Sequence, residues 1–78
     1  MNSLEFTAAF GGIKKRVKLF KAHGGPEGYQ ILIDNYFFGY LYFKDGNWMA
    51  RLGPSSALTM ADIQAFGERI DDAGMERL

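Results

Sequence analysis

The sequence predicts an α+β domain, an antiparallel meander of four to five strands followed by one C-terminal helix packed on one face of the sheet. Three observations predict this class. Apolar and polar side chains alternate in short runs up to residue 52, glycine-containing turn signals separate these runs, and helical spacing begins only after residue 58. With 78 residues, we expect a single small domain spanning 1–78, near the size at which an apolar core barely offsets chain entropy.

The first two strands are predicted on either side of Gly11-Gly12, which supplies a two-residue turn. Residues 4–10 alternate apolar and polar side chains, as in a half-buried strand. The alternative for residues 1–10 is a loose N-terminal strand or tail. The expected register pairs Phe10 with Ile13, Phe6 with Val17 and Leu4 with Leu19 on one face, and Glu5 with Lys18 on the other.

The run "IKKRVKLFK", residues 13–21, is the basic segment of the chain. Strand alternation places Lys14, Arg16 and Lys18 together on one face. One interpretation is a solvated face that opposes edge-to-edge pairing. The other is a stripe of three cations that contacts phosphates.

A turn-rich loop, "AHGGPEG", follows and contains the one histidine, His23. Only Glu27 is close in sequence as a partner for it, so neither a metal site nor a catalytic site is expected there. The remaining carboxylates are scattered over turns and the helix, and no cofactor motif is present. We therefore expect a protein that is not an enzyme and binds no cofactor.

The next strands cover residues 29–34, 37–43 and 48–52, and Asp45-Gly46 predicts a type I′ hairpin between the last two. The loop at 34–36 decides which side chains are core, because a shift of one residue reverses the faces of a strand. A three-residue loop is favoured, since the alternative buries Arg51 without a partner. The favoured loop groups Ile31 and Ile33 with Phe37, Leu41, Phe43 and Trp48; a two- or four-residue loop groups them with Phe38, Tyr40 and Tyr42.

The last element is a helix with a capping box, since Thr59 is followed three residues later by Asp62. Gly74 is expected to end it. Gly67 lies inside the apolar stripe, where close approach to Trp48 would explain a residue that weakens helices. The stripe consists of Ile63, Phe66, Gly67 and Ile70.

One helix of about 10 Å diameter is narrower than five strands spaced by about 4.8 Å. The sheet is therefore expected to curl towards a barrel, expose its second face, or bury that face against another chain. We expect the second face to bind another protein or to form a homodimer. Its candidate interface residues are Phe38, Tyr40, Tyr42, Met49 and Arg51.

The segment "YFFGYLYF" is similar to the aromatic strand motif of RNA-recognition domains, with Phe38, Gly39, Tyr40, Leu41 and Phe43 at matching or similar positions. The likeness covers eight residues. The family's βαββαβ order does not fit, because no helix can be placed between strands before residue 55. Only the stacking chemistry carries over, as an alternative function: binding of single-stranded nucleic acid, with Lys14, Arg16 and Lys18 as candidate phosphate contacts.

Composition limits the other functional classes. Nine basic residues balance nine acidic ones, so no net charge attracts the whole molecule to nucleic acid or to a membrane. The chain has no cysteine, which excludes disulfides and thiolate metal sites and favours an intracellular, cytoplasmic protein. No apolar run is long enough to span a membrane.

Overall fold

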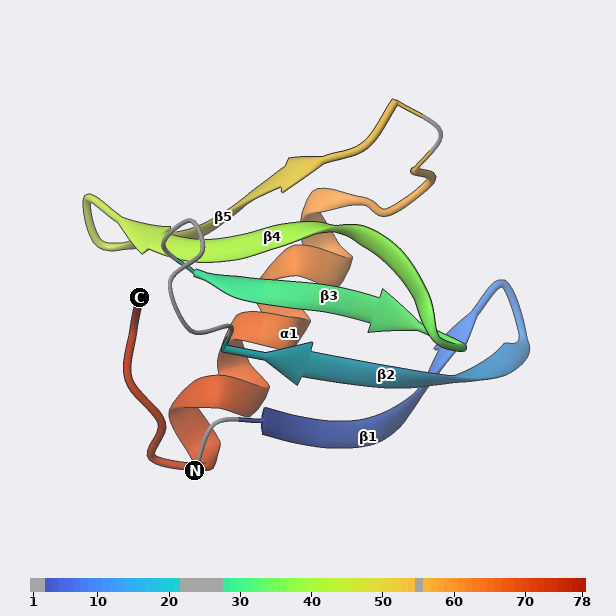
Figure 1. Ribbon diagram of the computed structural model, residues 1–78, viewed down its shortest axis with the longest axis horizontal. Helices are drawn as coiled ribbons and strands as arrows, with labels where there is room; N and C mark the ends of the chain where they lie inside the picture. The colour runs from blue at the N-terminus through green and yellow to red at the C-terminus, as the bar shows by residue number, and fades with distance from the viewer. Residues whose placement is uncertain (1–2, 22–27, 55) are drawn as a thin grey trace.

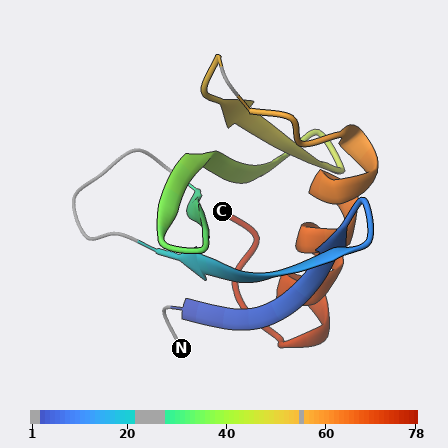
Figure 2. The same ribbon diagram turned by 90° about the vertical axis from the view of Figure 1, so that its right-hand side faces the viewer.

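The computed structural model describes residues 3–21, 28–54 and 56–78; His23 and Glu27 lie outside these ranges. Five strands form one antiparallel sheet in sequential order, and a single helix follows them, which confirms the predicted fold class. The sheet curls, and α1 lies along its concave side (Figures 1 and 2). The elements are β1 (Ser3–Phe10), β2 (Ile13–Phe20), β3 (Tyr29–Ile33), β4 (Tyr36–Lys44), β5 (Asn47–Leu52) and α1 (Met60–Asp72).

Two of the three strand-to-strand turns in the described residues have the predicted residues at their centres. Gly11 and Gly12 both have positive φ, at 57° and 84°, and Asp45 and Gly46 have φ of 53° and 80°. These values are typical of type I′ turns, whose twist matches that of the flanking strands. The predicted register of β1 on β2 is confirmed at every pair, from Phe10 opposite Ile13 to Leu4 opposite Leu19.

The β3–β4 connection is where the prediction was wrong. The turn has two central residues, Asp34 and Asn35, with φ of 50° and 69°, instead of a three-residue loop. A two-residue turn alone would reverse the faces of β4, but the register shifts between Ile31 and Leu32, and Phe38 has no partner in β3. This β-bulge adds one residue to β4. Beyond the bulge, the side chains of β4 therefore lie on the faces of the sheet that the sequence predicted.

The bulge exchanges the places of two phenylalanines. Phe37 was predicted to lie in the core, but it is 53% exposed and pairs with Leu32 on the face away from α1. Phe38 was predicted on that exposed face, but it is half-buried and packs against the core cluster. From Gly39 onward the predicted faces hold, since Leu41 and Trp48 are buried on the helix side.

The core lies between the concave side of the sheet and α1. The edge strand β1 reaches it through Phe6, whose ring meets that of Phe66 edge to face, with centroids 5.8 Å apart. Full burial of an aliphatic or aromatic side chain contributes about 1.5–3 kcal/mol, so this layer supplies most of the stabilisation. The buried apolar residues are Val17, Leu19, Tyr29, Ile31, Ile33, Leu41, Trp48, Ile63, Phe66 and Ile70.

The predicted ends of α1 are also confirmed. Thr59 and Asp62 form both hydrogen bonds of the capping box. At the other end, Gly74 has φ of 69°, and its N–H and that of Met75 donate to the last turn of the helix. Gly67 lies directly against Trp48, and a Cβ at that position would overlap the indole ring.

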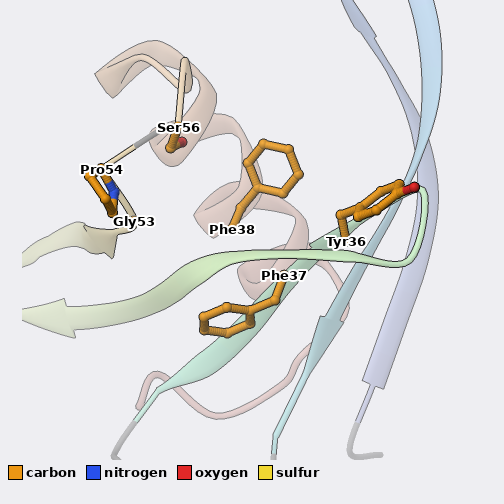
Figure 3. A pocket seen from close by; sticks show the side chains of 6 residues that line it. All are labelled: Tyr36, Phe37, Phe38, Gly53, Pro54 and Ser56. Atoms are coloured by element: carbon orange, nitrogen blue, oxygen red, sulfur yellow. The ribbon is translucent and has the colours of Figure 1, made fainter.

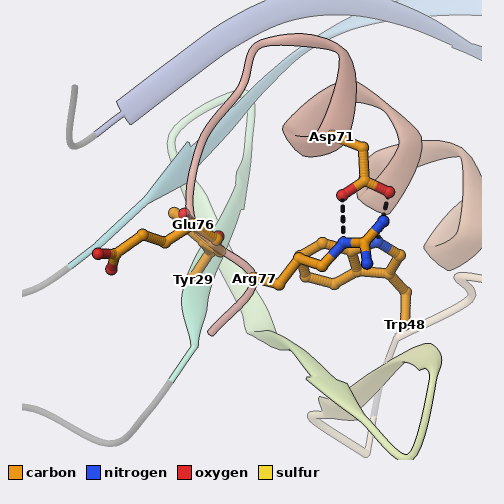
Figure 4. Close-up of polar contacts among 5 residues, drawn as sticks. All are labelled: Tyr29, Trp48, Asp71, Glu76 and Arg77. Carbon is orange, nitrogen blue, oxygen red and sulfur yellow. Dashed lines mark hydrogen bonds and ion pairs between the residues drawn. The ribbon is translucent and has the colours of Figure 1, made fainter.

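The segment that follows α1 turns back across one end of the curled sheet (Figure 4). The hydroxyl of the fully buried Tyr29 donates to the carbonyl oxygen of Glu76 over 2.6 Å. Arg77 lies over the ring of Phe43, 4.6 Å from its centroid, and donates to Asp71. These contacts attach residues 76 and 77 to β3, β4 and α1.

Candidate interaction surface

The sheet surface that faces away from α1 is here called the open face. Strand alternation places its side chains opposite the buried residues of each strand. In β2, for example, Lys18 and Phe20 alternate with the fully buried Val17 and Leu19. The open face includes Glu5, Thr7, Lys14, Arg16, Lys18, Phe20, Gln30, Leu32, Phe37, Tyr40, Tyr42, Met49 and Arg51.

Aromatic side chains occupy the β4 part of the open face. Phe37 and Tyr40 meet edge to face with ring centroids 5.3 Å apart, a contact that only the bulge makes possible. Figure 3 shows Phe37 and Phe38 pointing to opposite sides of β4. Next to them, Met49 of β5 lies across from Tyr42 and is 39% exposed.

Of the five predicted interface residues, the structure brings four together. Tyr40 pairs with Arg51 and Tyr42 pairs with Met49, so the four side chains form two adjacent rows across β4 and β5. Phe38 is the exception, because the bulge turns it to the core side. We call the cluster of Phe37, Tyr40, Tyr42, Met49 and Arg51 the aromatic patch.

Cations lie on β2, which β3 separates from the aromatic patch. Lys14, Arg16 and Lys18 share the open face, as predicted. Arg16 forms an ion pair with Glu5 of β1 over 3.6 Å, and both side chains are at least half exposed. Lys18 lies over the ring of Phe20 at 5.4 Å from its centroid, which holds that ammonium group against the sheet.

Basic and acidic side chains are equal in number in the sequence, but the fold places them in different parts of the molecule. The strands carry six basic side chains and one carboxylate, Glu5. Residues 60–78 carry five carboxylates and two arginines. The sheet is therefore electropositive and the helix with its C-terminal segment electronegative, although the formal net charge of the chain is zero. The strand cations are Lys14, Lys15, Arg16, Lys18, Lys44 and Arg51.

Two hollows lie at the end of the sheet where the bulge is. One, of about 410 Å³, is lined by Gly53, Pro54 and Ser56 together with the three consecutive rings that Figure 3 shows. The other, of about 110 Å³, contains Lys15 and the ring of Phe38. Among the described residues, neither lining includes a carboxylate or a histidine.

In the described residues, the titratable groups with shifted pKa values lie outside both hollows. Burial, and then the charge of Glu76, raise the pKa of the Tyr29 phenol. A hydrogen bond from Arg77 holds the pKa of Asp71 below its usual value, and a second bond from Trp48 acts in the same direction. These groups join α1 and the C-terminal segment to the sheet, so their shifts reflect structural contacts. The described ranges contain no cluster of three metal-ligating side chains.

Sequence reasoning missed three members of the open face: Phe20, Leu32 and Phe37. The first two follow from the alternation of β2 and β3, since each neighbours a buried residue. The third depends on the bulge. Its available signal was Gly39, because a glycine inside a strand often marks a bulge or a close backbone approach. A side chain at Gly39 would overlap the carbonyl oxygen of Arg51.

No protein-family model, curated protein or solved structure matches this chain. Within the described residues, no helix has the length and apolar character that crossing a membrane requires.

Proposed function

We propose that this protein is a small, non-enzymatic interaction module and that the open face is its docking surface. The observation that carries the proposal is the aromatic patch, which lies on the side of the sheet that α1 leaves uncovered. Tyrosine, phenylalanine, methionine and arginine are the residue types enriched at the centres of protein interfaces. The proposed setting is the cytoplasm, which the cysteine-free composition supports.

The geometry of the patch supports a stable contact. Tyr40 and Tyr42 are half-buried by their neighbours, so their rings lose little conformational freedom on binding. Phe37 is more than half exposed and offers apolar surface to a partner. Arg51 stands at the β5 side, where its guanidinium can bind a carboxylate with two parallel hydrogen bonds.

The charge of the open face favours an acidic partner protein over a second copy of this chain. Two copies meeting face to face would bring Lys14, Arg16, Lys18 and Arg51 together, and in the described residues the carboxylates beside them are those of Glu5 and Asp34. Like charges that approach across an interface weaken binding. A partner with carboxylates around an apolar centre would pair with both the cations and the rings.

Two methionines provide matched probes of the proposed surface. Met49 lies in the aromatic patch, and Met60 lies on α1; both are exposed, at 39% and 61%. With the methyl groups labelled with ¹³C, we expect the signal of Met49 to shift or broaden in an extract of the cells that make the protein. The signal of Met60 should stay in place. Tyr40→Asp should abolish the effect at Met49, because it adds a carboxylate at the centre of the patch.

The far-ultraviolet spectrum and unfolding curve of the Tyr40→Asp variant control for folding. A Met49 signal that stays unchanged in the extract, or an effect confined to Met60, would contradict the proposal. Treating the extract with nuclease separates partner classes. If the Met49 effect survives, a nucleic acid is excluded as the partner, as the proposal requires, and if it is lost, the partner is a nucleic acid.

Binding of single-stranded nucleic acid is the second candidate, and the charge separation between sheet and helix is the observation that favours it. A row of cations on β2 and aromatic rings on β4 share the open face, with β3 between them, and cations together with rings are the combination that proteins use to hold a phosphate backbone and stack bases. Phe37 lies next to Tyr40 on the open face, so these two rings are the candidates for stacking on bases.

An oligothymidine labelled with a fluorophore tests this candidate by anisotropy. Tyr40→Ala should weaken binding by about 1–3 kcal/mol if a base stacks on that ring. The logarithm of the association constant should fall with the logarithm of salt concentration, with a slope of about −0.7 for each phosphate contact. Binding that high salt leaves unchanged would rule out phosphate contacts by Lys14, Arg16 and Lys18.

A further inference from the structure

The outer edge of β1 carries backbone groups that the described chain leaves unpaired. Phe10 and Ile13 flank the two-residue turn, so their backbone groups exchange hydrogen bonds. Along an antiparallel ladder, such hydrogen-bonded pairs alternate with pairs that exchange no hydrogen bonds. Every second residue of β1 therefore points its N–H and C=O away from β2. These outward residues are Ser3, Glu5, Thr7 and Ala9.

The other edge of the sheet shows the same alternation. The same alternation from the Lys44–Asn47 pair places the backbone of Trp48 on the outer side of β5. Its carbonyl oxygen indeed accepts a hydrogen bond there, from Nε2 of Gln64 on α1, over 2.6 Å. The helix thus partly satisfies the β5 edge. In the described residues, no hydrogen bond reaches an outward backbone group of β1.

β1 also lacks the features that normally keep a sheet edge from pairing. It is eight residues long, its register on β2 is continuous, and it contains no proline or lysine. Its one charge is Glu5, which is already paired with Arg16. Figure 1 shows β1 at the margin of the sheet, and the side chains of Thr7 and Ala9 are exposed.

We propose that β1 pairs antiparallel with β1 of a second copy, so that two five-stranded sheets join across a two-fold axis. This proposal goes beyond the docking function of the open face, because it uses a different surface and a different partner. The two interfaces are compatible, since strand pairing leaves the aromatic patches of both copies uncovered.

One register uses all the outward groups. It places Phe6 opposite Phe6 of the second copy, with Glu5 opposite Thr7 and Ser3 opposite Ala9. Each of the four resulting pairs exchanges two bonds, which gives about eight new backbone hydrogen bonds. No like charges face each other directly, and the two Phe6 rings, each half-buried in the single copy, meet at the axis.

Two further observations favour a second copy over an unrelated strand. The same register puts Glu5 in one cross-sheet row with Thr7 and Arg16 of the second copy, because Thr7 pairs with Arg16 within each chain. Arg16 would then lie about 10 Å from a second carboxylate, so their attraction should stabilise the dimer at low salt and be largely screened at physiological salt. A chain of 78 residues also has a small core, which association supplements.

Amide hydrogen exchange tests the proposal at single residues. Raising the protein concentration should slow exchange at Glu5, Thr7 and Ala9, whose N–H groups point outward. Exchange at Phe6 and Ala8 should depend far less on concentration, because their N–H groups already bond to β2. Equal behaviour of the two sets at all concentrations would overturn the proposed pairing.

Light scattering with size-exclusion chromatography provides the second test. The dimer should dissociate at least tenfold more readily in two edge variants, Thr7→Pro and Ala9→Lys. The first removes one outward donor, which an edge strand tolerates, and the second adds the lysine that natural edges use. Tyr40→Asp on the open face is the control and should leave the dimer intact.

A monomer at every concentration would refute the inference, as would a dimer that Tyr40→Asp breaks while both edge variants preserve it. A monomer would leave the docking proposal for the open face untouched, because the Met49 signal in the extract reports that separately, whereas a dimer that Tyr40→Asp breaks would place the second copy on the open face. If Thr7→Pro fails to fold, Ala9→Lys still decides the outcome, since it changes no backbone donor.

Discussion

A single carboxylate, Asp71, links α1, the sheet and the C-terminal segment (Figure 4). One oxygen accepts a hydrogen bond from Nε1 of Trp48 over 3.2 Å, and the other accepts one from Nε of Arg77 over 2.8 Å. The indole N–H of a buried tryptophan needs such a partner, since an unpaired donor costs about 1–3 kcal/mol. A carboxylate near the C-terminus of a helix opposes the macrodipole, and these two donors offset that cost.

This arrangement predicts a dependence of stability on acid. Hydrogen bonding from Arg77 and Trp48 lowers the pKa of Asp71 in the folded state relative to the unfolded chain. Its contribution is therefore present above the unfolded pKa of about 3.9 and is lost as the pH falls through the lower folded value. Thermal unfolding between neutral and strongly acidic pH should show a smaller loss of stability on acidification for Asp71→Asn than for the original protein.

Asp72→Asn is the matched control for this measurement, because Asp72 makes no side-chain hydrogen bond within the described residues. It removes the same charge one residue further along the helix. If both variants reduce the acid dependence equally, general helix charge would explain the effect instead of the two hydrogen bonds.

Gly67 shows how much a single residue can reveal before a structure is known. A glycine in the middle of an apolar helical stripe costs about 1 kcal/mol relative to alanine, and this cost implied a compensating contact with a large ring. The structure shows Trp48 in that position. Tyr29 gave no such signal, because a tyrosine at the start of a strand is equally compatible with either face of the sheet.

For the strands, turns and helix, the sequence was sufficient wherever a local signal determined the geometry. Gly11-Gly12, Asp45-Gly46 and the Thr59 capping box each specify a turn or helix end through their own backbone preferences. The β4 bulge was not predictable in this way. Asp34-Asn35 accepts several loop lengths, and the choice depends on packing Phe38 against residues far along the chain.

The C-terminal segment could not be predicted either, since residues 73–78 show no strand or helix period. It is nevertheless attached by specific bonds, chief among them the one from the Tyr29 hydroxyl to the carbonyl oxygen of Glu76. Tyr29→Phe should lower the free energy of unfolding by about 1 kcal/mol, because the carbonyl oxygen loses its donor. Urea titration followed by Trp48 fluorescence measures this change.

The same residue predicts an alkaline effect. Burial raises the pKa of the Tyr29 phenol in the fold, so its contribution is fully present below the unfolded value of about 10 and is lost as the pH rises through the folded value. Tyr29→Phe should remove that loss. Tyr42→Phe, on the open face, is the control, and an equal effect from it would show that tyrosine ionisation in general is responsible.

In the whole molecule, the separation of charge between sheet and helix predicts binding to polyanions, which the net charge alone does not predict. At neutral pH the formal net charge is zero, yet the open face should bind a polyanion such as heparin. Arg16→Gln combined with Lys18→Gln should lower the salt concentration needed for elution, because both cations lie on that face. Lys15→Gln combined with Arg69→Gln removes the same charge from the helix side and should change elution much less. Equal effects from the two pairs would mean that total charge governs binding, and the surface would then have no preferred anionic side.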